Sequence, residues 1–302
     1  MTRSTTCPST GNTALPTAWM QLGLPLLFIV LYGSGFVGAK LGLPHAGPFS
    51  FLALRFGLAA VLLTAIAVAI KAPWPRHGRD WLQVAGAGLL GIGVFSAGVF
   101  CSIALGLPPA ISALIVALNP IVVALGAGPL LGERVSLRQF AGLLLGLFGV
   151  YLVLRDRLSV DPAYLNAVLL SVLALIGLAC GNLYQKHSCG SMNIFTGGAV
   201  QCGASALAMA VGMWFFNEGA VQWTGEFVFA LLWMTLAVSI GAVSILYLMI
   251  RRAEVIRAAS VFYLMPVSAA ITAYALFGQV LKAAALLGIG VTVVGVMMAM
   301  RR

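Results

Sequence analysis

The sequence predicts an all-α integral membrane protein whose ten transmembrane helices form a 5+5 inverted-topology repeat, with the N- and C-termini in the cytoplasm. Three observations predict this fold: the composition, a series of apolar runs, and an internal repeat. Of the 302 residues, 61% are hydrophobic and 8% are charged, whereas a soluble domain has about 25% charged residues. Most of the exterior must therefore face lipid, and a water-soluble globular protein is excluded.

Residues 1–18 form the first segment, a polar stretch of Thr, Ser and Pro whose single charge is Arg3. We expect a disordered tail there, because the stretch is too polar to span a bilayer. The apolar run that follows has no small-residue cleavage site before Lys40 and is succeeded by further apolar runs. It is therefore interpreted as the first span and not as a removable signal peptide.

Ten apolar runs are bounded by charged residues or prolines. A spanning helix takes about 20 residues, and the runs that reach or approach this length are 19–40, 49–70, 81–104, 110–131, 138–154, 163–185, 194–216, 227–250, 257–277 and 281–300. The run 138–154 is short, and the connection at Gly278 and Gln279 is minimal. Nine and eleven spans are alternatives that would break the charge pattern described next.

Basic residues are distributed unevenly between alternate connections. With the N-terminus inside, the cytoplasmic side holds Arg3, Lys71, Arg76, Arg79, Arg134, Arg138, Lys186, Arg251, Arg252, Arg257, Arg301 and Arg302. The other side holds only Lys40, Arg155, Arg157 and Lys282. The positive-inside rule therefore predicts cytoplasmic termini and supports an even number of spans. We expect a multi-pass protein of the inner (plasma) membrane. The basic residues form no stripe with interleaved aromatics, so the partner is the lipid bilayer and no nucleic acid is expected despite the net charge of +10.

Residues that could hold a metal, a cofactor or a nucleotide are sparse. The cysteines Cys7, Cys101, Cys180, Cys189 and Cys202 show no CxxC spacing and are interpreted as structural thiols. The histidines are isolated and the carboxylates fall in or beside predicted loops, so a membrane-embedded enzyme is only a remote alternative and no metal or cofactor is expected. Two GxGxxG matches, at 33–38 and 86–91, lie inside apolar runs without a βαβ unit and indicate close helix packing.

An internal repeat relates the two halves of the chain, because residues 31–154 align with residues 177–300 without a gap. The offset of 146 pairs Gly35 with Gly181, Lys40 with Lys186, Pro120 with Pro266, Gly132 with Gly278, Gly142 with Gly288 and Gly149 with Gly295. Each half, 19–155 and 163–302, contains five predicted spans, so the second copy enters from the opposite side of the membrane. Inverted repeats of this kind are typical of secondary transporters, and a duplicated scaffold without a transport role is the alternative.

The motifs of the first half are Tyr32-Gly-Ser-Gly-Phe-Val-Gly-Ala-Lys40, Arg55-Phe56, Asn119-Pro120 and Leu131-Gly132-Glu133-Arg134, and the second half contains Ala258-Ala259-Ser260, Pro266 and Phe277-Gly278-Gln279. From about residue 19 onwards the chain resembles the EamA-type, ten-helix members of the drug/metabolite transporter superfamily. The resemblance implies a carrier, usually an exporter of amino acids or other small metabolites, with a central cavity between the halves. Glu133 aligns with Gln279 and Arg55 with Gln201, so a symmetric role for these charges is not expected.

Polar side chains within the apolar runs are the candidate substrate contacts, because an unpaired ionisable group in hydrocarbon costs about 2.5–3.5 kcal/mol or more. Arg55 is expected either to attract an anionic substrate group or to extend to the outer headgroups. Asn119 is the strongest candidate, with an interhelical hydrogen bond as its alternative. The further candidates for the cavity lining are Tyr32, Ser34, Asn182, Tyr184 and Tyr263.

The expected function is a secondary transporter that exports small polar metabolites such as amino acids by alternating access. Pro120, Pro266, Gly35 and Gly181 are candidate hinges or kinks. No Asp, Glu or His lies well inside a span, which favours gradient-following transport; Glu133 and Lys40 are the candidates if transport is coupled. A proton-coupled drug or organic-cation efflux carrier is the alternative, and the carrier is expected to work as a monomer or a homodimer.

Overall fold

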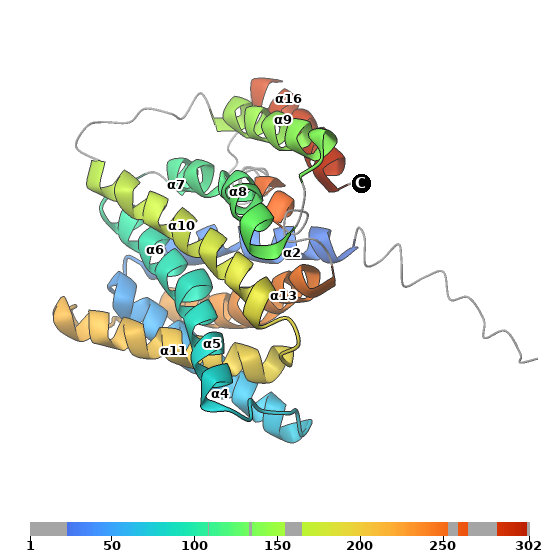
Figure 1. Cartoon of the computed structure of the whole chain (residues 1–302). Helices are drawn as coiled ribbons and strands as arrows, with labels where there is room; N and C mark the ends of the chain where they lie inside the picture. The colour runs from blue at the N-terminus through green and yellow to red at the C-terminus, as the bar shows by residue number, and fades with distance from the viewer. Residues whose placement is uncertain are drawn as a thin grey trace, which may run out of the picture.

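A computed structural model describes residues 23–107, 109–132, 135–154, 165–252, 259–264 and 283–300, and all their regular structure is helical (Figure 1). The first half contains α2 Leu24–Gly33, α3 Gly35–Gly42, α4 Pro48–Ala69, α5 Gly78–Gly88, the π-helix η2 Leu89–Val94, α6 Phe95–Ala104, α7 Pro109–Val116, α8 Asn119–Leu131 and α9 Leu137–Leu154. The second half contains α10 Leu165–Ser188, α11 Ile194–Phe215, α12 Gly225–Trp233, the π-helix η5 Met234–Ala242, α13 Val243–Arg252, the 3₁₀-helix η6 Val261–Leu264 and α16 Ala283–Met300.

Five continuous helical segments of the described chain are long and apolar enough to cross a membrane: 48–69, 78–104, 165–188, 194–215 and 225–251. Each coincides with a predicted span to within a few residues. The first predicted span is divided at Ser34, and the fourth is divided at 117–118. The chain is therefore a multi-pass membrane protein, while the full count of ten spans and the orientation of the termini stay predictions.

The helix boundaries repeat at the offset found in the sequence. That offset carries both ends of α4 onto those of α11, and both ends of α9 onto those of α16. It also places η2 inside η5, so each half contains a π-helical segment in its third span. Helices related in this way pack on each other, α4 on α11 and α9 on α16, and the second pair lies side by side along one edge of the bundle (Figure 1).

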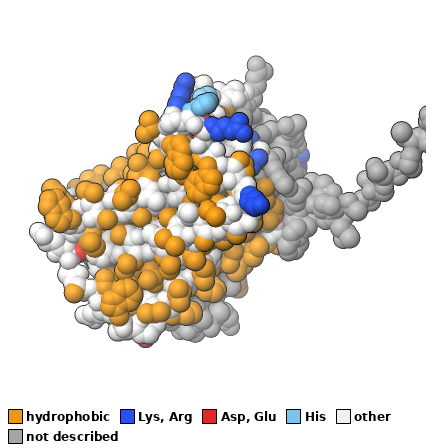
Figure 2. Space-filling view, turned by 90° about the horizontal axis from the view of Figure 1, so that it is seen from below, with side chains coloured by type: hydrophobic (Ala, Val, Ile, Leu, Met, Phe, Trp, Pro, Cys, Tyr) orange, Lys and Arg blue, Asp and Glu red, His pale blue; other side chains and the backbone are white. Residues whose placement is uncertain are grey.

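Apolar side chains make up both the core and much of the surface. The core is continuous across the two halves, and its largest wholly buried side chains include Phe51, Phe56 and Phe227. On the outside, Leu82, Leu125 and Trp214 are each at least 75% exposed. Figure 2 shows hydrophobic side chains over most of one described face, with Lys and Arg toward one edge. An exterior this apolar is stable in contact with lipid chains and not with water.

Basic side chains and one set of connections gather at one end of the bundle, which we call the basic end. Lys186 Nζ donates to the carbonyl of Ile250 at 2.8 Å, and Arg251 Nη1 donates to the carbonyl of Met192 at 3.2 Å. The Thr196 hydroxyl donates to the carbonyl of Pro73 at 3.0 Å, which brings the 70–77 connection to the same end. Lys71, Arg76 and Arg79 belong to this connection and the start of α5.

The opposite end carries a carboxylate that caps a helix of the other half. Glu218, in the connection before α12, accepts hydrogen bonds from the backbone N–H groups of Phe49 and Ser50 at 3.0 and 2.6 Å, and from the Ser50 hydroxyl at 2.7 Å. These N–H groups belong to the first turn of α4, whose N-terminus has no internal partners for them and carries a partial positive charge. Glu218 therefore stabilises the α4 terminus and joins the two halves.

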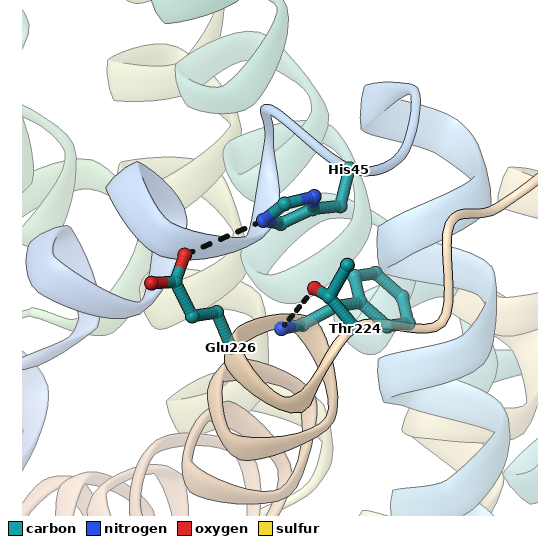
Figure 3. A network of polar contacts seen from close by, with 4 residues as sticks. His45, Thr224 and Glu226 are labelled. Carbon is teal, nitrogen blue, oxygen red and sulfur yellow. Dashed lines mark hydrogen bonds and ion pairs between the residues drawn. The ribbon is translucent and has the colours of Figure 1, made fainter.

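A second polar contact between the halves lies at this same end (Figure 3). The His45 ring points toward Glu226, with 3.5 Å between Nε2 and Oε2, and the Thr224 hydroxyl caps α12 by accepting from the Phe227 N–H at 3.2 Å. The Glu226 side chain is 72% exposed. An ion pair with so exposed a partner contributes about 0–1 kcal/mol, so Glu218 is the stronger connection.

Replacing Glu218 tests this difference. Glu218→Ala removes three hydrogen bonds from the α4 terminus and should lower the free energy of unfolding by about 1–2 kcal/mol, the size of a lost helix cap. Glu226→Ala, at the same end, is the matched control and should cost less than about 1 kcal/mol. Thermal unfolding of the purified protein in detergent measures both, and equal effects of the two variants would contradict the capping role.

Close helix contacts depend on glycine at several positions. A Cβ on Gly181 of α10 would fall on the backbone of Gly91 in η2, and a Cβ on Gly295 of α16 would fall on the backbone of Gly146 in α9. Backbones approach this closely only where both helices lack side chains. Gly181, expected to be a hinge, is thus a point of tight contact between the third and sixth spans.

A glycine-to-alanine pair tests the contact. Gly181→Ala should lower the free energy of unfolding by about 1–3 kcal/mol, because the methyl group meets backbone that has no room to move. Gly57→Ala in α4 adds the same methyl group where no atom lies within 4 Å, and should leave the stability unchanged or slightly raised, since alanine favours helix. Unfolding temperatures in detergent compare them; a Gly181→Ala protein that melts with the wild type would refute the tight contact.

Candidate functional site

A cavity lies between the two halves, at the interface where secondary transporters bind substrate. It contains about 400 Å³ of space that no protein atom fills, including the open solvent at its mouth. Its walls come from the first, second and third spans of the first half and from η5 of the second half: Tyr32, Gly35, Ala39, Arg55, Phe95, Ser96, Val99, Phe100, Met234 and Val238. A bound molecule would therefore touch both repeats.

Arg55 is the charged residue of this cavity. It lies in the interior of α4, is 5% exposed, and its Nε donates to the Ser239 hydroxyl at 2.7 Å. Its guanidinium carbon also lies 5.0 Å from the centre of the Phe56 ring. The alternative that Arg55 extends to the headgroups is therefore wrong, because the side chain turns inward and is held by the opposite repeat.

The two terminal nitrogens of Arg55 have no hydrogen-bond partner in the described part of the chain. Among the lining residues of this cavity there is no Asp, Glu or His. A guanidinium carries a permanent charge and presents its N–H groups as a fixed fork that matches a carboxylate. The arrangement can accordingly bind an anionic group in a pocket with largely apolar walls.

Ser239 is a site residue that sequence reasoning missed. It is 3% exposed and lies in the π-helix η5, where the wider turn of the backbone changes which side chains face the neighbouring helices. A serine inside a long apolar run is itself a signal of this kind, because such a hydroxyl needs a partner within the membrane. Sequence reasoning passed over it because short-range pattern does not reveal that η5 packs against α4.

The repeat-related position in the second half is neutral. Gln201 takes the place of Arg55, and its Nε2 donates to Gln185 Oε1 at 2.7 Å, with both side chains buried. Ser239 has Gly93 as its counterpart, which offers no hydroxyl. The two halves therefore differ at this position in charge, as the sequence predicts, and also in hydrogen-bond partner. The first half has the cation Arg55, and the second half has an amide that donates to another amide.

The aromatic wall of the cavity centres on Tyr32 in the last turn of α2. Its ring centre lies 5.0 Å from that of Phe28, 6.2 Å from that of Phe95 and 5.7 Å from that of Phe262. Ser34 has a different position: its hydroxyl donates to the Leu31 carbonyl at 2.6 Å and accepts from Trp233 Nε1 at 2.9 Å. Ser34 thus holds the junction of α2 and α3 and is not among the lining residues, whereas Gly35 is.

Three further candidates are buried polar groups outside this lining. Asn119 is fully buried, and neither atom of its amide has a partner among the described residues. The same holds for Asn182 Nδ2 and for the Tyr263 hydroxyl, which lies in a cluster with Ala117 and Leu143. Unpaired buried polar atoms are rare, and each is costly unless another state or a ligand supplies a partner.

Pro120 differs from its expected place inside a helix. It is the second residue of α8, after the break at 117–118, where the missing N–H group is not needed. The repeat carries this break onto residues 263–264 of the second half, which belong to the 3₁₀-helix η6. Both halves therefore depart from α-helix at the break. The divided fourth span, and not a kink of one continuous helix, is the observed feature. Pro266, Glu133 and the side chain of Lys40 lie outside the described residues.

Tyr184 lies apart from the cavity lining. It packs with Val84, Ala87 and Cys189 in a separate apolar cluster where α5 meets the end of α10. Cys189 follows that helix, and burial raises the pKa of its thiol to about 11, so the thiol stays protonated at neutral pH. These contacts are those of a packing cluster, and Tyr184 is not among the lining residues of the cavity.

Comparison with known proteins places the chain in a family. The sequence profile of the EamA-like transporter family matches residues 19–155 and again residues 165–301. The chain belongs to this family. The resemblance drawn from its motifs is thereby confirmed, and the EamA-like transporter family supplies the class of the protein, a transporter.

Relatives of this EamA-like transporter include proteins named "Probable amino-acid metabolite efflux pump" from Escherichia coli (strain K12), 29% identical over 54% of this chain and 52% of that protein, and from Salmonella typhimurium, 32% identical over the same shares. The matches thus span about half the length of these relatives. An uncharacterised transporter of Bacillus subtilis is 23% identical over 83% of this chain and 82% of its own. A crystal structure has the same fold, with a TM-score of 0.78, 21% identity and coverage of 92% and 96%.

Asn119 allows a test that separates a functional residue from a structural one. Asn119→Leu replaces an unpaired buried amide with an apolar group of similar size and should raise the free energy of unfolding by about 1–3 kcal/mol, while transport falls. Gln201→Leu is the matched control: it leaves Gln185 unpaired and should lower the stability. Unfolding temperatures measure both, and an Asn119→Leu protein that is less stable than the wild type would show that the amide is already paired.

Proposed function

We propose that the chain is a secondary transporter that exports small polar metabolites such as amino acids, by alternating access around the cavity that Arg55 lines. The family is one of transporters, and two relatives carry the name amino-acid metabolite efflux pump. The observation that supports this proposal most directly is the buried Arg55, whose terminal nitrogens have no described partner, in a cavity walled by both repeats.

In this mechanism the substrate carboxylate binds the terminal nitrogens of Arg55, while Ser239 holds the guanidinium in place through its Nε. Tyr32, Phe95 and Phe100 contact the remainder of the molecule. Binding through groups of both repeats favours closure of the halves around the substrate, and rocking then opens the other side. The divided first and fourth spans supply the positions where backbone angles change.

The proposal includes ten spans in two inverted repeats, cytoplasmic termini and residence in the plasma membrane. The repeat is supported by the common offset of helix boundaries, its inversion by the odd number of predicted spans in each half, and the orientation by the basic residues collected at the basic end. We propose facilitated transport that follows the substrate gradient, because the lining of this cavity contains no carboxylate or imidazole for proton exchange. Organic-cation efflux is disfavoured, because Arg55 repels a cation in the same enclosure.

Transport by purified protein in liposomes tests the function. Uptake of radiolabelled amino acids should be saturable, should proceed without a proton gradient, and should accelerate when unlabelled substrate fills the lumen, as a carrier requires. A panel that also contains nucleosides and organic cations provides the contrast. Uptake that depends on a proton gradient would contradict the facilitated mechanism, and non-saturable flux would contradict a carrier.

Charge removal in the cavity gives the second test. Arg55→Gln should lower kcat/KM for carboxylate substrates by roughly 10- to 150-fold, since a hydrogen-bonded charge contributes about 1.5–3 kcal/mol. Arg251→Gln removes an exposed cation at the basic end and serves as the matched control, with an expected change of less than about twofold. Both variants should insert in equal amounts; unaltered transport by Arg55→Gln would remove Arg55 from the site.

A further inference from the structure

We infer that the cavity selects substrates with a net charge of −1 and an apolar body, and discriminates against zwitterions of the same shape. This inference rests on the proposed function and refines its substrate class. Monocarboxylates with an aromatic or branched aliphatic body, such as amino-acid derivatives without the amino group, bind most tightly, and the amino acids themselves are carried with lower affinity. It follows from the net charge of the cavity, the geometry of its one cation and the chemistry of its other walls.

The net charge of the lining is the first step. Arg55 is buried, its hydrogen-bond partner Ser239 is neutral, and no acidic residue is among the lining residues of this cavity. Charges interact strongly in an apolar enclosure, and an uncompensated one is costly. A monoanion neutralises the site when it binds, whereas a zwitterion brings both charges and leaves the enclosure with the same excess positive charge.

The geometry of the cation is the second step. Ser239 occupies the Nε of Arg55, which leaves the edge formed by the two terminal nitrogens for a ligand. That edge matches the two oxygens of one carboxylate in a bidentate pair. Since Gln201 replaces the arginine in the other half and is paired with Gln185, no second cation is related to Arg55 by the repeat. Arg55 thus pairs with one carboxylate. A dicarboxylate would carry a second negative charge for which the equivalent position in the other half offers no cation.

The remaining walls are the third step. Apart from Arg55, the lining offers the hydroxyls of Tyr32 and Ser96, and otherwise aromatic and aliphatic groups such as Phe95, Phe100 and Met234. A substrate ammonium has three donors that all need acceptors once water is removed. Two hydroxyls beside a guanidinium are poor acceptors for an ammonium group. An aromatic or branched aliphatic group, by contrast, fits the apolar walls.

Two matched ligand pairs test the inference on the purified, full-length protein: phenylalanine with 3-phenylpropionate, and leucine with 4-methylpentanoate. Binding is measured by the shift of the unfolding temperature in detergent at neutral pH, which avoids leakage of the protonated acids through liposomes. Uptake into liposomes, corrected with protein-free vesicles, is the second readout. We expect the acid without the amino group to bind at least about 10-fold more tightly than its amino acid in at least one pair. Phenethylamine should produce no shift.

Variants show whether Arg55 and Ser239 are the cause. Arg55→Gln should bring the ratio of the two affinities close to 1, and Arg55→Lys should keep part of the preference because it keeps the charge without the fork. Ser239→Ala should raise KM for the acids by about 3- to 10-fold, because the guanidinium loses its fixed orientation. Ser205→Ala removes a buried hydroxyl that bonds to Gly88 and is the control, with KM unchanged. The ratio of affinities is taken within one preparation, and KM does not depend on the amount of active protein, so a loss of folded protein alters neither quantity.

The outcomes separate this inference from the function on which it rests. Tighter binding of the amino acid, or equal binding of both members of each pair, overturns the monoanion preference and leaves the carrier in place. A preference that persists in Arg55→Gln also overturns it, since another group would then be responsible. Binding of no acid and no amino acid of the pairs refutes the inference, and the uptake panel described above then decides separately whether the proposed carrier function fails as well.

Discussion

The arrangement of the cavity depends on one buried interaction, the hydrogen bond from Arg55 to Ser239. A guanidinium placed inside a protein that is itself surrounded by lipid has no water to solvate it, so its neighbours must compensate its charge. Ser239 meets one of its donors and comes from the other repeat. This hydrogen bond thus links α4 to η5 across the interface of the halves. The two terminal nitrogens of Arg55 are the atoms that bind the substrate carboxylate in the proposed function.

The repeat explains why this site has a single charge although the fold is duplicated. Helix boundaries, π-helical segments and the paired helices α4 with α11 and α9 with α16 follow one offset. Side chains are free to diverge on that common backbone. In the second half, Gln201 donates one hydrogen bond to Gln185, and its own side-chain oxygen has no described partner. The position of Arg55 in one repeat is therefore cationic, and the equivalent position in the other repeat is neutral. A site that binds a charged molecule in one orientation requires such a difference.

Polar groups at the ends of the bundle and in its interior act differently. At the water-exposed end opposite the basic residues, Glu218 closes the first turn of α4, and the exposed His45–Glu226 pair adds little. In the interior, Asn119 and the Tyr263 hydroxyl have no described partner. A polar atom that lacks a protein partner can bond to water when it is exposed. When it is buried, it costs free energy until another conformation or a ligand provides a partner. The interior groups are therefore the ones that we propose to act in function.

The sequence by itself determined the membrane class, most helix positions and the internal repeat, and it singled out Arg55 as a candidate, because apolar length, prolines and glycines, and a charge inside an apolar run are properties of the local chain. Only the tertiary structure decided which polar residues meet. It brought Tyr32, Gly35 and Arg55 together, added Ser239, assigned Ser34 to a helix junction, and placed Tyr184 and Gly181 in packing contacts. It also divided the span that contains Pro120. The reason is physical: spacing along one helix states which face a side chain occupies, but the partner of that face comes from a helix far away in the sequence.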